Sequence, residues 1–164
     1  MNSTYLLVVK ILEKLVIVLL AGIVLVVTLQ VFSRFILQSP SSITEELARF
    51  LLIWIGLFGG AYGYHSNAHL GLDIFTNKIQ GVSHHLVSIM AHLLIMLFAV
   101  VVMIIGGVSL VSLTFDPVQV SAALEIKMGY VYSAVPIAGG LIVFISVVKI
   151  SHLLAQVSSS KKAA

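Results

Sequence analysis

The longest stretch without a charged side chain most constrains how this sequence can fold. From Ile79 to Phe115 the chain runs for about 37 residues without Asp, Glu, Lys or Arg. The hydrocarbon layer of a bilayer is about 30 Å thick, and a helix of about 20 apolar residues crosses it. At about 1.5 Å per residue the tract would reach roughly 55 Å, which is too long for one upright crossing. The tract therefore predicts one transmembrane helix over 86–113, with the remainder tilted or at the membrane interface.

Three further charge-poor stretches have the length of a membrane span, which predicts an all-α integral membrane protein with four transmembrane helices. The composition agrees, because 60% of the residues are hydrophobic and 9% are charged, whereas an ordinary soluble domain has about 25% charged residues. No small-residue cleavage site follows the first apolar run, so we expect a retained helix rather than a signal peptide. We predict a single four-helix domain over 1–164, with spans at about 15–37, 44–66, 86–113 and 128–149.

The basic residues predict which way the four helices cross the membrane. Cytoplasmic segments carry an excess of Lys and Arg, and with four spans both termini and the middle loop share one side. That side holds Lys10, Lys14, Lys78, Lys149, Lys161 and Lys162, and the other side holds Arg34, Arg49 and Lys127. We therefore expect cytoplasmic N- and C-termini. Because these residues are scattered between apolar blocks, they form no patch for nucleic acid.

The densest charge cluster stands directly ahead of the second span, in the stretch SPSSITEELARFLLIWIGLFGG over 39–60. Ser42 and Glu45 have the spacing of a capping box, which predicts that a helix begins here. Glu45 and Glu46 precede Arg49 by four and three residues, so on a helix both carboxylates can reach its guanidinium. Two interpretations stay open, a helix cap with a local ion pair and an outward contact for a partner protein. A catalytic carboxylate pair has little in its favour.

The second span is rich in small residues at helical spacing. Gly56 and Gly60 form one small-xxx-small pair, and Gly59 and Gly63 form another. Such pairs let helix backbones approach closely in a membrane. The glycine face either packs within the four-helix unit or receives a larger partner. Trp54 is either a packing residue or an interface anchor.

No acidic or basic side chain lies at the centre of any predicted span. Carriers and ion channels usually need such groups, or a carbonyl-lined constriction, along their pathway. This favours a scaffold or accessory subunit, although backbone carbonyls alone can bind sodium. Pro136 falls inside the fourth span and predicts a kink there.

The histidines raise two hypotheses about bound metals. His65, His69 and Asp73 are four residues apart at the predicted end of the second span, which favours helix capping and leaves partner contact and zinc binding as alternatives. His92 lies inside the third span and suggests haem b, but no other helix offers a deep histidine opposite it. Residues 72–82 carry an apolar stripe that predicts a short interfacial helix or a solvated loop. The chain has no cysteine, so disulfides and thiolate metal sites are excluded.

Two blocks of the sequence resemble a known family. The stretch ITEELARFLLIWIGLFGGAYGYHSNAHLGLD resembles the signature of the small, Q-type membrane subunit of TRAP transporters, the tripartite ATP-independent periplasmic carriers. The stretch ALEIKMGYVYSAVPIAGGLI is similar to the last helix of that subunit. The matching positions are Glu45, Glu46, Leu47, Ala48, Arg49, Trp54, Gly60, Ala61, Ala68, His69 and Asp73, followed by Tyr132 and Pro136.

The resemblance implies an accessory transport subunit in a bacterial inner membrane and not an enzyme. In such transporters a large membrane subunit carries the substrate and sodium, and a soluble periplasmic protein captures the substrate and delivers it. The small subunit would buttress the large one and help to dock the periplasmic protein. No cofactor is expected in this chain, and sodium coupling is expected in the large subunit. Family substrates are organic acids, including sialic acid and C4-dicarboxylates, and overall likeness favours sialic acid.

Two other classes of protein remain as alternatives. One is a haem-b membrane anchor of a respiratory enzyme. The other is a small stand-alone multidrug exporter, which would need a carboxylate embedded in the membrane. Neither explains the pattern over residues 45–73.

Overall fold

The computed structural model describes residues 3–39, 41–66 and 82–162, and within these ranges it contains helices and connecting loops with no β-strand. In lipid every backbone N–H and C=O must be bonded inside the protein, and a helix achieves this within one segment. The elements are α1 (Ser3–Phe35), α2 (Ser42–His65), α4 (Val82–Phe98), the π-helical η1 (Ala99–Gly106), α5 (Gly107–Phe115), α6 (Met128–Tyr132) and α7 (Ala134–Lys162).

Four helical stretches are long and apolar enough to cross a membrane, which confirms the predicted four-helix membrane protein. They are Ser3–Phe35, Ser42–His65, Val87–Phe115 and Met128–Ala155. The first begins well before the predicted position 15, because the helix continues through the charged residues near the N-terminus. The long uncharged tract becomes one rod of α4, η1 and α5. The predicted interfacial helix over 72–82 lies outside the described residues except for Val82, the first residue of α4.

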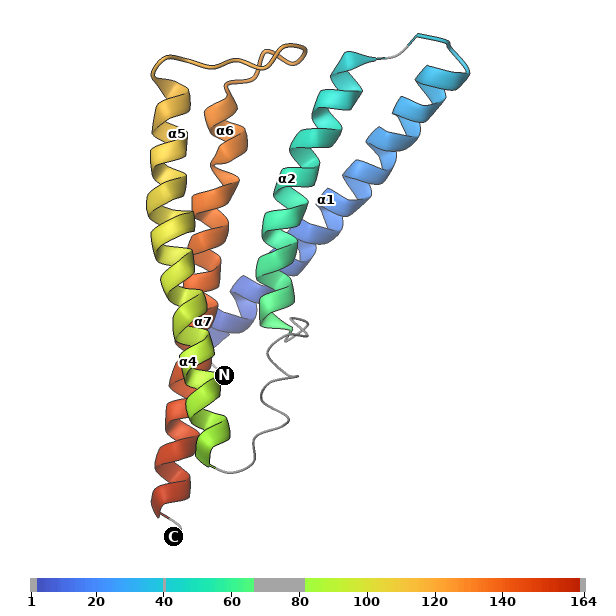
Figure 1. Cartoon of the computed structure of the whole chain (residues 1–164). Coiled ribbons are helices and arrows are strands. Elements are labelled where there is room, and N and C mark those ends of the chain that lie inside the picture. The colour runs from blue at the N-terminus through green and yellow to red at the C-terminus, as the bar shows by residue number, and fades with distance from the viewer. Residues whose placement is uncertain (1–2, 40, 67–81, 163–164) are drawn as a thin grey trace.

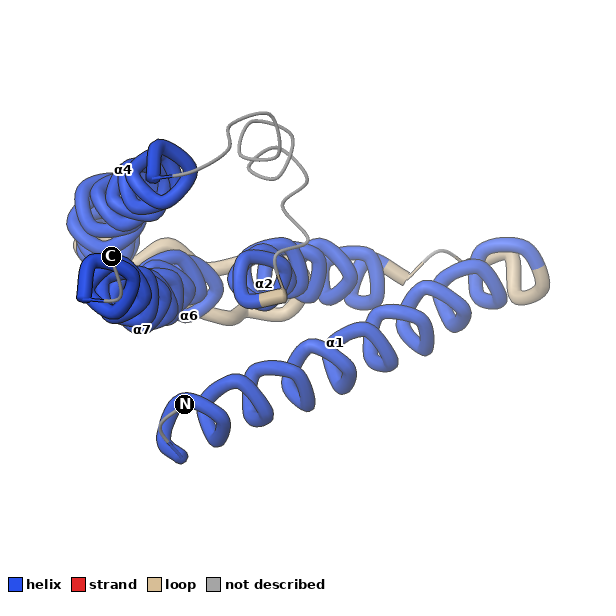
Figure 2. The backbone as a smooth tube through the Cα atoms, turned by 90° about the horizontal axis from the view of Figure 1, so that it is seen from below, coloured by secondary structure: helices blue, strands red, loops and turns tan. Residues whose placement is uncertain are grey.

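The helices form two arms that meet in the lower half of Figure 1. One arm contains α4, η1 and α5, which run antiparallel to α6 and α7. The other contains α1 and α2 and leans away toward the end that carries the turn at 36–39 and the loop at 116–127. We call this the loop end, and the opposite end, where α7 ends, the terminal end. Seen from below, α2 lies between α1 and α6 (Figure 2).

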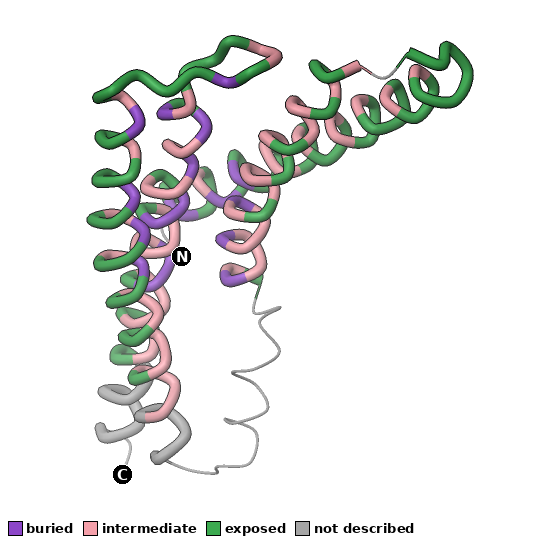
Figure 3. The backbone as a smooth tube through the Cα atoms, turned by 45° about the horizontal axis from the view of Figure 1, so that its top comes forward, coloured by how far each residue is buried: buried purple, intermediate pink, exposed green. Residues whose placement is uncertain are grey.

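The core lies where the two arms meet. Its main cluster joins α1, α2, η1 and α7 through the buried residues Leu12, Phe58, Ala61, Ala99, Met103 and Ala138. A second cluster, Tyr5, Val9, Tyr64 and Ile145, lies nearer the terminal end. Elsewhere large apolar side chains are exposed, most continuously on α1 (Figure 3). Because only 6% of the apolar window of α1 is buried, most of this helix offers an apolar surface to lipid or to another protein.

Two glycines allow α7 to approach the neighbouring rod closely. A Cβ atom added at Gly139 would lie 2.7 Å from Cβ of Met103, and one added at Gly107 would lie 2.9 Å from Cδ of Pro136. Such contacts are too short for any side chain, so the crossing requires glycine at both positions. The fourth span is interrupted at Ser133, which follows the end of α6 as its C-cap and lies three residues before Pro136.

Candidate functional site

The first turn of α2 is capped one residue earlier than the sequence pattern predicts. Ser41 is the N-cap, and its hydroxyl oxygen accepts a hydrogen bond from the backbone N–H of Thr44 at 3.5 Å. The hydroxyl of Thr44 donates back to the carbonyl of Ser41 at 3.0 Å. The predicted capping box between Ser42 and Glu45 is therefore wrong. Thr44, not Glu45, occupies the third helical position, and Glu45 is left to interact with other side chains.

Glu45 and Arg49 form an exposed ion pair near the start of α2. Their side chains are 53% and 69% exposed, respectively, and the carboxylate accepts a hydrogen bond from the guanidinium. An exposed pair of this kind contributes little to stability, because water screens it and both long side chains lose freedom. The pair therefore places one acid and one base at a defined position on the surface, where a partner could meet them.

Glu46 does not join this ion pair, contrary to the sequence-based expectation, and instead binds the distant loop at 116–127. Its carboxylate accepts backbone N–H groups of Ala122 at 3.2 Å, Ala123 at 2.9 Å and Leu124 at 2.8 Å. It also accepts the hydroxyl of Ser121 at 3.2 Å. Four donors on one carboxylate form an anion-binding loop. The loop between α5 and α6 is thereby attached to the first turn of α2, which belongs to the other arm.

Sequence reasoning missed this attachment because the donors are backbone groups. The loop residues 121–124 read Ser-Ala-Ala-Leu, and three of them carry no side-chain donor. The loop is further shaped by backbone pairing between Val120 and Lys127 and by a hydrogen bond from the N–H of Ile126 to the hydroxyl of Ser121 at 3.3 Å. Glu125 adopts a positive φ of 54°, which turns the chain at the tip.

One face of α2 carries the ion pair near the start of the helix and glycines further along. We call this face the α2 stripe. Its members follow one another at steps of four and three residues and so lie on one side of the helix: Glu45, Arg49, Leu52, Gly56, Gly59 and Gly63. Leu52 is 62% exposed. Gly60 lies at the edge of the stripe.

The glycines of the α2 stripe make no close helix contact within the described chain. A Cβ atom added at Gly56, Gly59, Gly60 or Gly63 would meet nothing within 4 Å. This differs from the tight fit around Gly139. Of the two interpretations of these glycines, packing inside the four-helix unit therefore has no support in the described contacts, and the stripe is open to another helix.

A polar cluster joins the helices near the terminal end. The hydroxyl of Tyr64 lies 2.8 Å from Nδ1 of His92 and 3.0 Å from the hydroxyl of Ser146, and the Nζ of Lys149 donates to the carbonyl of Tyr64 at 2.5 Å. Next to this cluster, the hydroxyl of Tyr5 lies 2.6 Å from Nδ1 of His65, which joins α1 to the end of α2. Interhelical hydrogen bonds of this type stabilise membrane helices.

The remaining candidate residues fall into two groups. Trp54 packs edge-on against Phe58 with ring centroids 5.2 Å apart and lies against the main core cluster. His69 and Asp73 lie outside the described residues. The predicted metal-ligand set of His65 with these two residues therefore lies partly outside the described residues. Within them, His65 is hydrogen-bonded to Tyr5 and its ring also lies near that of Tyr62.

The fold and these contacts define a multi-pass helical membrane protein whose arms are joined by polar groups near both ends. A family model described as "Tripartite ATP-independent periplasmic transporters, DctQ component" matches residues 23–156. The chain therefore belongs to this family and is a transporter component of the inner membrane, not an enzyme. Because the chain belongs to this family, we set aside the two alternative classes, a haem-b membrane anchor and a stand-alone multidrug exporter.

Three relatives carry names from the same class. The chain is 26% identical over 148 residues to a Haemophilus influenzae protein named as a TRAP transporter small permease, covering 90% of this chain and 88% of the relative. It is 26% identical to the sialic acid TRAP transporter small permease protein SiaQ of Vibrio cholerae, over 87% of this chain and 80% of the relative. It is 27% identical to the C4-dicarboxylate TRAP transporter small permease protein DctQ of Rhodobacter capsulatus, over 61% of this chain and 44% of the relative.

Proposed function

We propose that this chain is the small permease subunit of a sodium-coupled importer of an organic acid. In this proposal a large membrane subunit carries the substrate and sodium, and a periplasmic protein delivers the substrate. The chain itself buttresses the large subunit. Its polar contacts support a scaffold role, because the Tyr64 hydroxyl is engaged by His92 and Ser146 within the chain. The relatives named for sialic acid and for C4-dicarboxylates support these two substrate classes, and we favour sialic acid.

The observation that carries the proposal is the open α2 stripe. Gly56 is exposed, and apart from its chain neighbours and the adjacent backbone of α2, no described atom lies within 4 Å of where its Cβ would be. A partner helix can approach such a surface until the backbones touch, which gains packing energy where lipid offers no hydrophobic driving force. The Glu45–Arg49 pair at the loop end of the stripe supplies charges that can fix the register of that helix. We infer that the α2 stripe contacts the large subunit.

A substitution at Gly56 tests this contact. Gly56→Leu adds a side chain where the chain has open space, so we expect the isolated subunit to fold normally. The same side chain would separate the α2 stripe from a partner helix, so co-purification with the large subunit and uptake should both fall. Gly140→Leu is the matched control, because Gly140 is also exposed with no described atom within 4 Å of an added Cβ but lies on α7. Equal assembly of both variants would refute the proposed contact surface.

Uptake in proteoliposomes tests the function as a whole. The large subunit and the periplasmic protein are reconstituted with or without this chain, and sodium-dependent uptake of sialic acid and of a C4-dicarboxylate is measured. We expect uptake only when all three components are present. Uptake by this chain alone would overturn the scaffold role, and equal uptake with the chain omitted would remove its requirement.

We further propose that the loop at 116–127 helps to dock the periplasmic protein. Glu46 holds this loop against α2, and Val118 and Val120 are exposed on it by 55% and 52%. With cytoplasmic termini, as the basic residues predict, this loop faces the periplasm. Val120→Asp should then raise the concentration of periplasmic protein needed for half-maximal uptake while assembly with the large subunit is retained. An unchanged requirement would contradict the docking role.

A further inference from the structure

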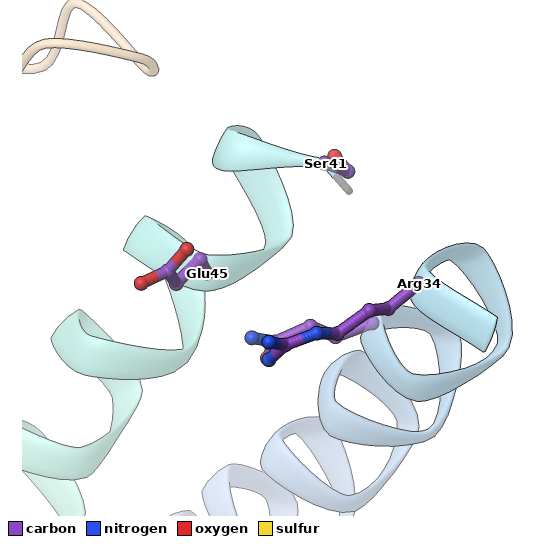
Figure 4. Close-up of a pocket in the computed structure, with 4 residues that line it drawn as sticks. Arg34, Ser41 and Glu45 are labelled. Atoms are coloured by element: carbon purple, nitrogen blue, oxygen red, sulfur yellow. The ribbon is translucent and has the colours of Figure 1, made fainter. Parts of the chain in front are cut away.

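A polar cavity lies at the loop end between the last turns of α1 and the first turn of α2. Its volume is about 280 Å³, and it is lined by Gln30, Arg34, Ser41 and Glu45. Gln30 and Arg34 are four residues apart on α1 and therefore share one side of that helix. Figure 4 shows Arg34 extending from α1 toward α2, with Ser41 at the start of α2 and Glu45 about one turn further on.

Three of the lining side chains have hydrogen-bond donors that the described chain does not use. Arg34 forms no ion pair with any described carboxylate, and its recorded contact is with the ring of the adjacent Phe35 at 6.0 Å. The oxygen of Ser41 accepts from Thr44, but its O–H group donates to no described atom. The amide of Gln30 likewise has no partner among the described residues. The cavity thus gathers a guanidinium, a hydroxyl and an amide whose donors are available to a ligand.

The charge around the cavity favours an anion. Glu45 is already paired with Arg49, so the charge of Arg34 is left uncompensated by that pair. A guanidinium presents a planar fork of donors that matches two oxygens of a phosphate group. The hydroxyl and the amide can donate to the remaining phosphate oxygens or to hydroxyls of a headgroup.

The position of the cavity indicates that the anion belongs to a lipid. Arg34 stands at the end of a membrane span, at the level where headgroups begin. The apolar residues Phe35, Ile36 and Leu37 follow Arg34 in the sequence, and Ile43 lies in the first turn of α2. All four are more than half exposed, so they can lie among acyl chains while the cavity holds a headgroup. The cavity also lies at the junction with α1, the helix with the most exposed apolar surface.

We propose that this cavity binds the headgroup of an anionic phospholipid, with the phosphodiester on Arg34 and further hydrogen bonds from Gln30 and Ser41. The bound lipid would fill the space between α1 and α2 at the loop end. It would stiffen the outer part of α1, which has few protein contacts of its own. Glu45 belongs both to the lining of this cavity and to the α2 stripe, but the proposal rests on Arg34, Gln30 and Ser41 and does not depend on the contact of the stripe with the large subunit.

Lipid retention by the purified full chain tests the proposal. The wild type and Arg34→Gln are incubated in detergent with phosphatidylglycerol or with phosphatidylcholine, and bound lipid is counted by native mass spectrometry. A basic side chain near a membrane surface contributes a factor of about five to the binding of an anionic lipid. We therefore expect Arg34→Gln to reduce phosphatidylglycerol retention about fivefold and to leave phosphatidylcholine unchanged. Arg34→Lys, which keeps the charge without the fork, should retain an intermediate amount.

Lys127→Gln is the matched control, because it removes an exposed basic side chain at the same end without touching the cavity. If this variant lost as much phosphatidylglycerol as Arg34→Gln, general surface charge would explain the binding and the proposal would fail. Equal retention by Arg34→Gln and wild type would also overturn it. Displacement of the lipid by millimolar glycerol 3-phosphate would identify a soluble anion as the ligand instead. Unchanged lipid retention with weaker co-purification of the large subunit would assign Arg34 to a protein partner.

Discussion

The adjacent glycines Gly139 and Gly140 on α7 offer the sharpest test of how α7 packs against η1. A methyl group at Gly139 would lie 2.7 Å from Cβ of Met103 and 3.3 Å from the carbonyl oxygen of Ala99. Neither atom is the end of a flexible side chain, so α7 must move away from η1. A methyl group at Gly140 meets nothing within 4 Å. The same substitution should therefore leave the protein less stable at Gly139 than at Gly140.

The magnitude follows from two effects. Replacing glycine by alanine in a helix gains about 1 kcal/mol from backbone propensity at either position. Overpacking a close contact costs about 1–3 kcal/mol, and this cost applies at Gly139 alone. We expect Gly139→Ala to be less stable than Gly140→Ala by about 1–3 kcal/mol. Propensity cancels in this comparison because both residues lie in the same helix.

Fluorescence of Trp54, the single tryptophan of the chain, can report unfolding. Trp54 packs against the same core cluster that contains Met103 and Ala99, so separation of α7 from η1 should alter its surroundings. Each variant is unfolded from mild detergent by increasing the mole fraction of SDS, and the midpoints are compared. If the two variants unfolded at the same midpoint, the close crossing at Gly139 would be refuted.

Three further predictions concern polar groups. In the first two, a substitution is compared with the same substitution at a nearby residue of the same type. Glu46→Gln should increase hydrogen exchange of the loop amides that the carboxylate binds, whereas Glu45→Gln should leave them protected. Equal exchange of these amides in the two variants would contradict the attachment of the loop to Glu46. Tyr64→Phe should lower the free energy of unfolding by about 0.6–1.7 kcal/mol because it removes an interhelical hydroxyl. The hydroxyl of Tyr62 has no described hydrogen bond, so Tyr62→Phe should change the free energy of unfolding little. Charge reversal at Glu45 or at Arg49 should impair assembly with the large subunit without affecting membrane insertion. A control variant exchanges the two residues and so restores their ion pair. Full recovery of assembly in this variant would show that the pair acts only within the chain.

The membrane spans were predictable because they depend on length and composition. A run of about 20 apolar residues has few alternatives to a helix in lipid, so the four spans follow directly from the positions of the charges. The interruption near Pro136 has a similar local cause, since proline lacks the N–H that would continue the helix. The π-helical η1 was not predictable, because its residues are all apolar or small and carry no periodic signal.

The candidate site was less predictable because it depends on which neighbour each residue meets. Gly56 and Gly139 both belong to small-residue patterns, yet an added Cβ would have open space at the first and a short contact at the second. Glu45 and Glu46 are adjacent carboxylates, but the helix turns them to different sides. Glu46 then finds backbone donors from a loop more than 70 residues away, a partner that no local pattern indicates.

The two attachments of α2 have a mechanical consequence. Helices joined at a single point can rotate about it as about a hinge, whereas a second attachment far from the first fixes the angle. Glu46 binds the loop of the other arm near one end of α2, and Tyr64 binds His92 and Ser146 near the other. The two residues are roughly 27 Å apart along the helix axis, so a slack of about 1 Å at either attachment permits only about 2° of rotation. The two attachments thus fix the angle between the arms. The resistance of the arms to bending then comes from the carboxylate of Glu46 and the hydroxyl of Tyr64 rather than from the width of the hydrophobic core.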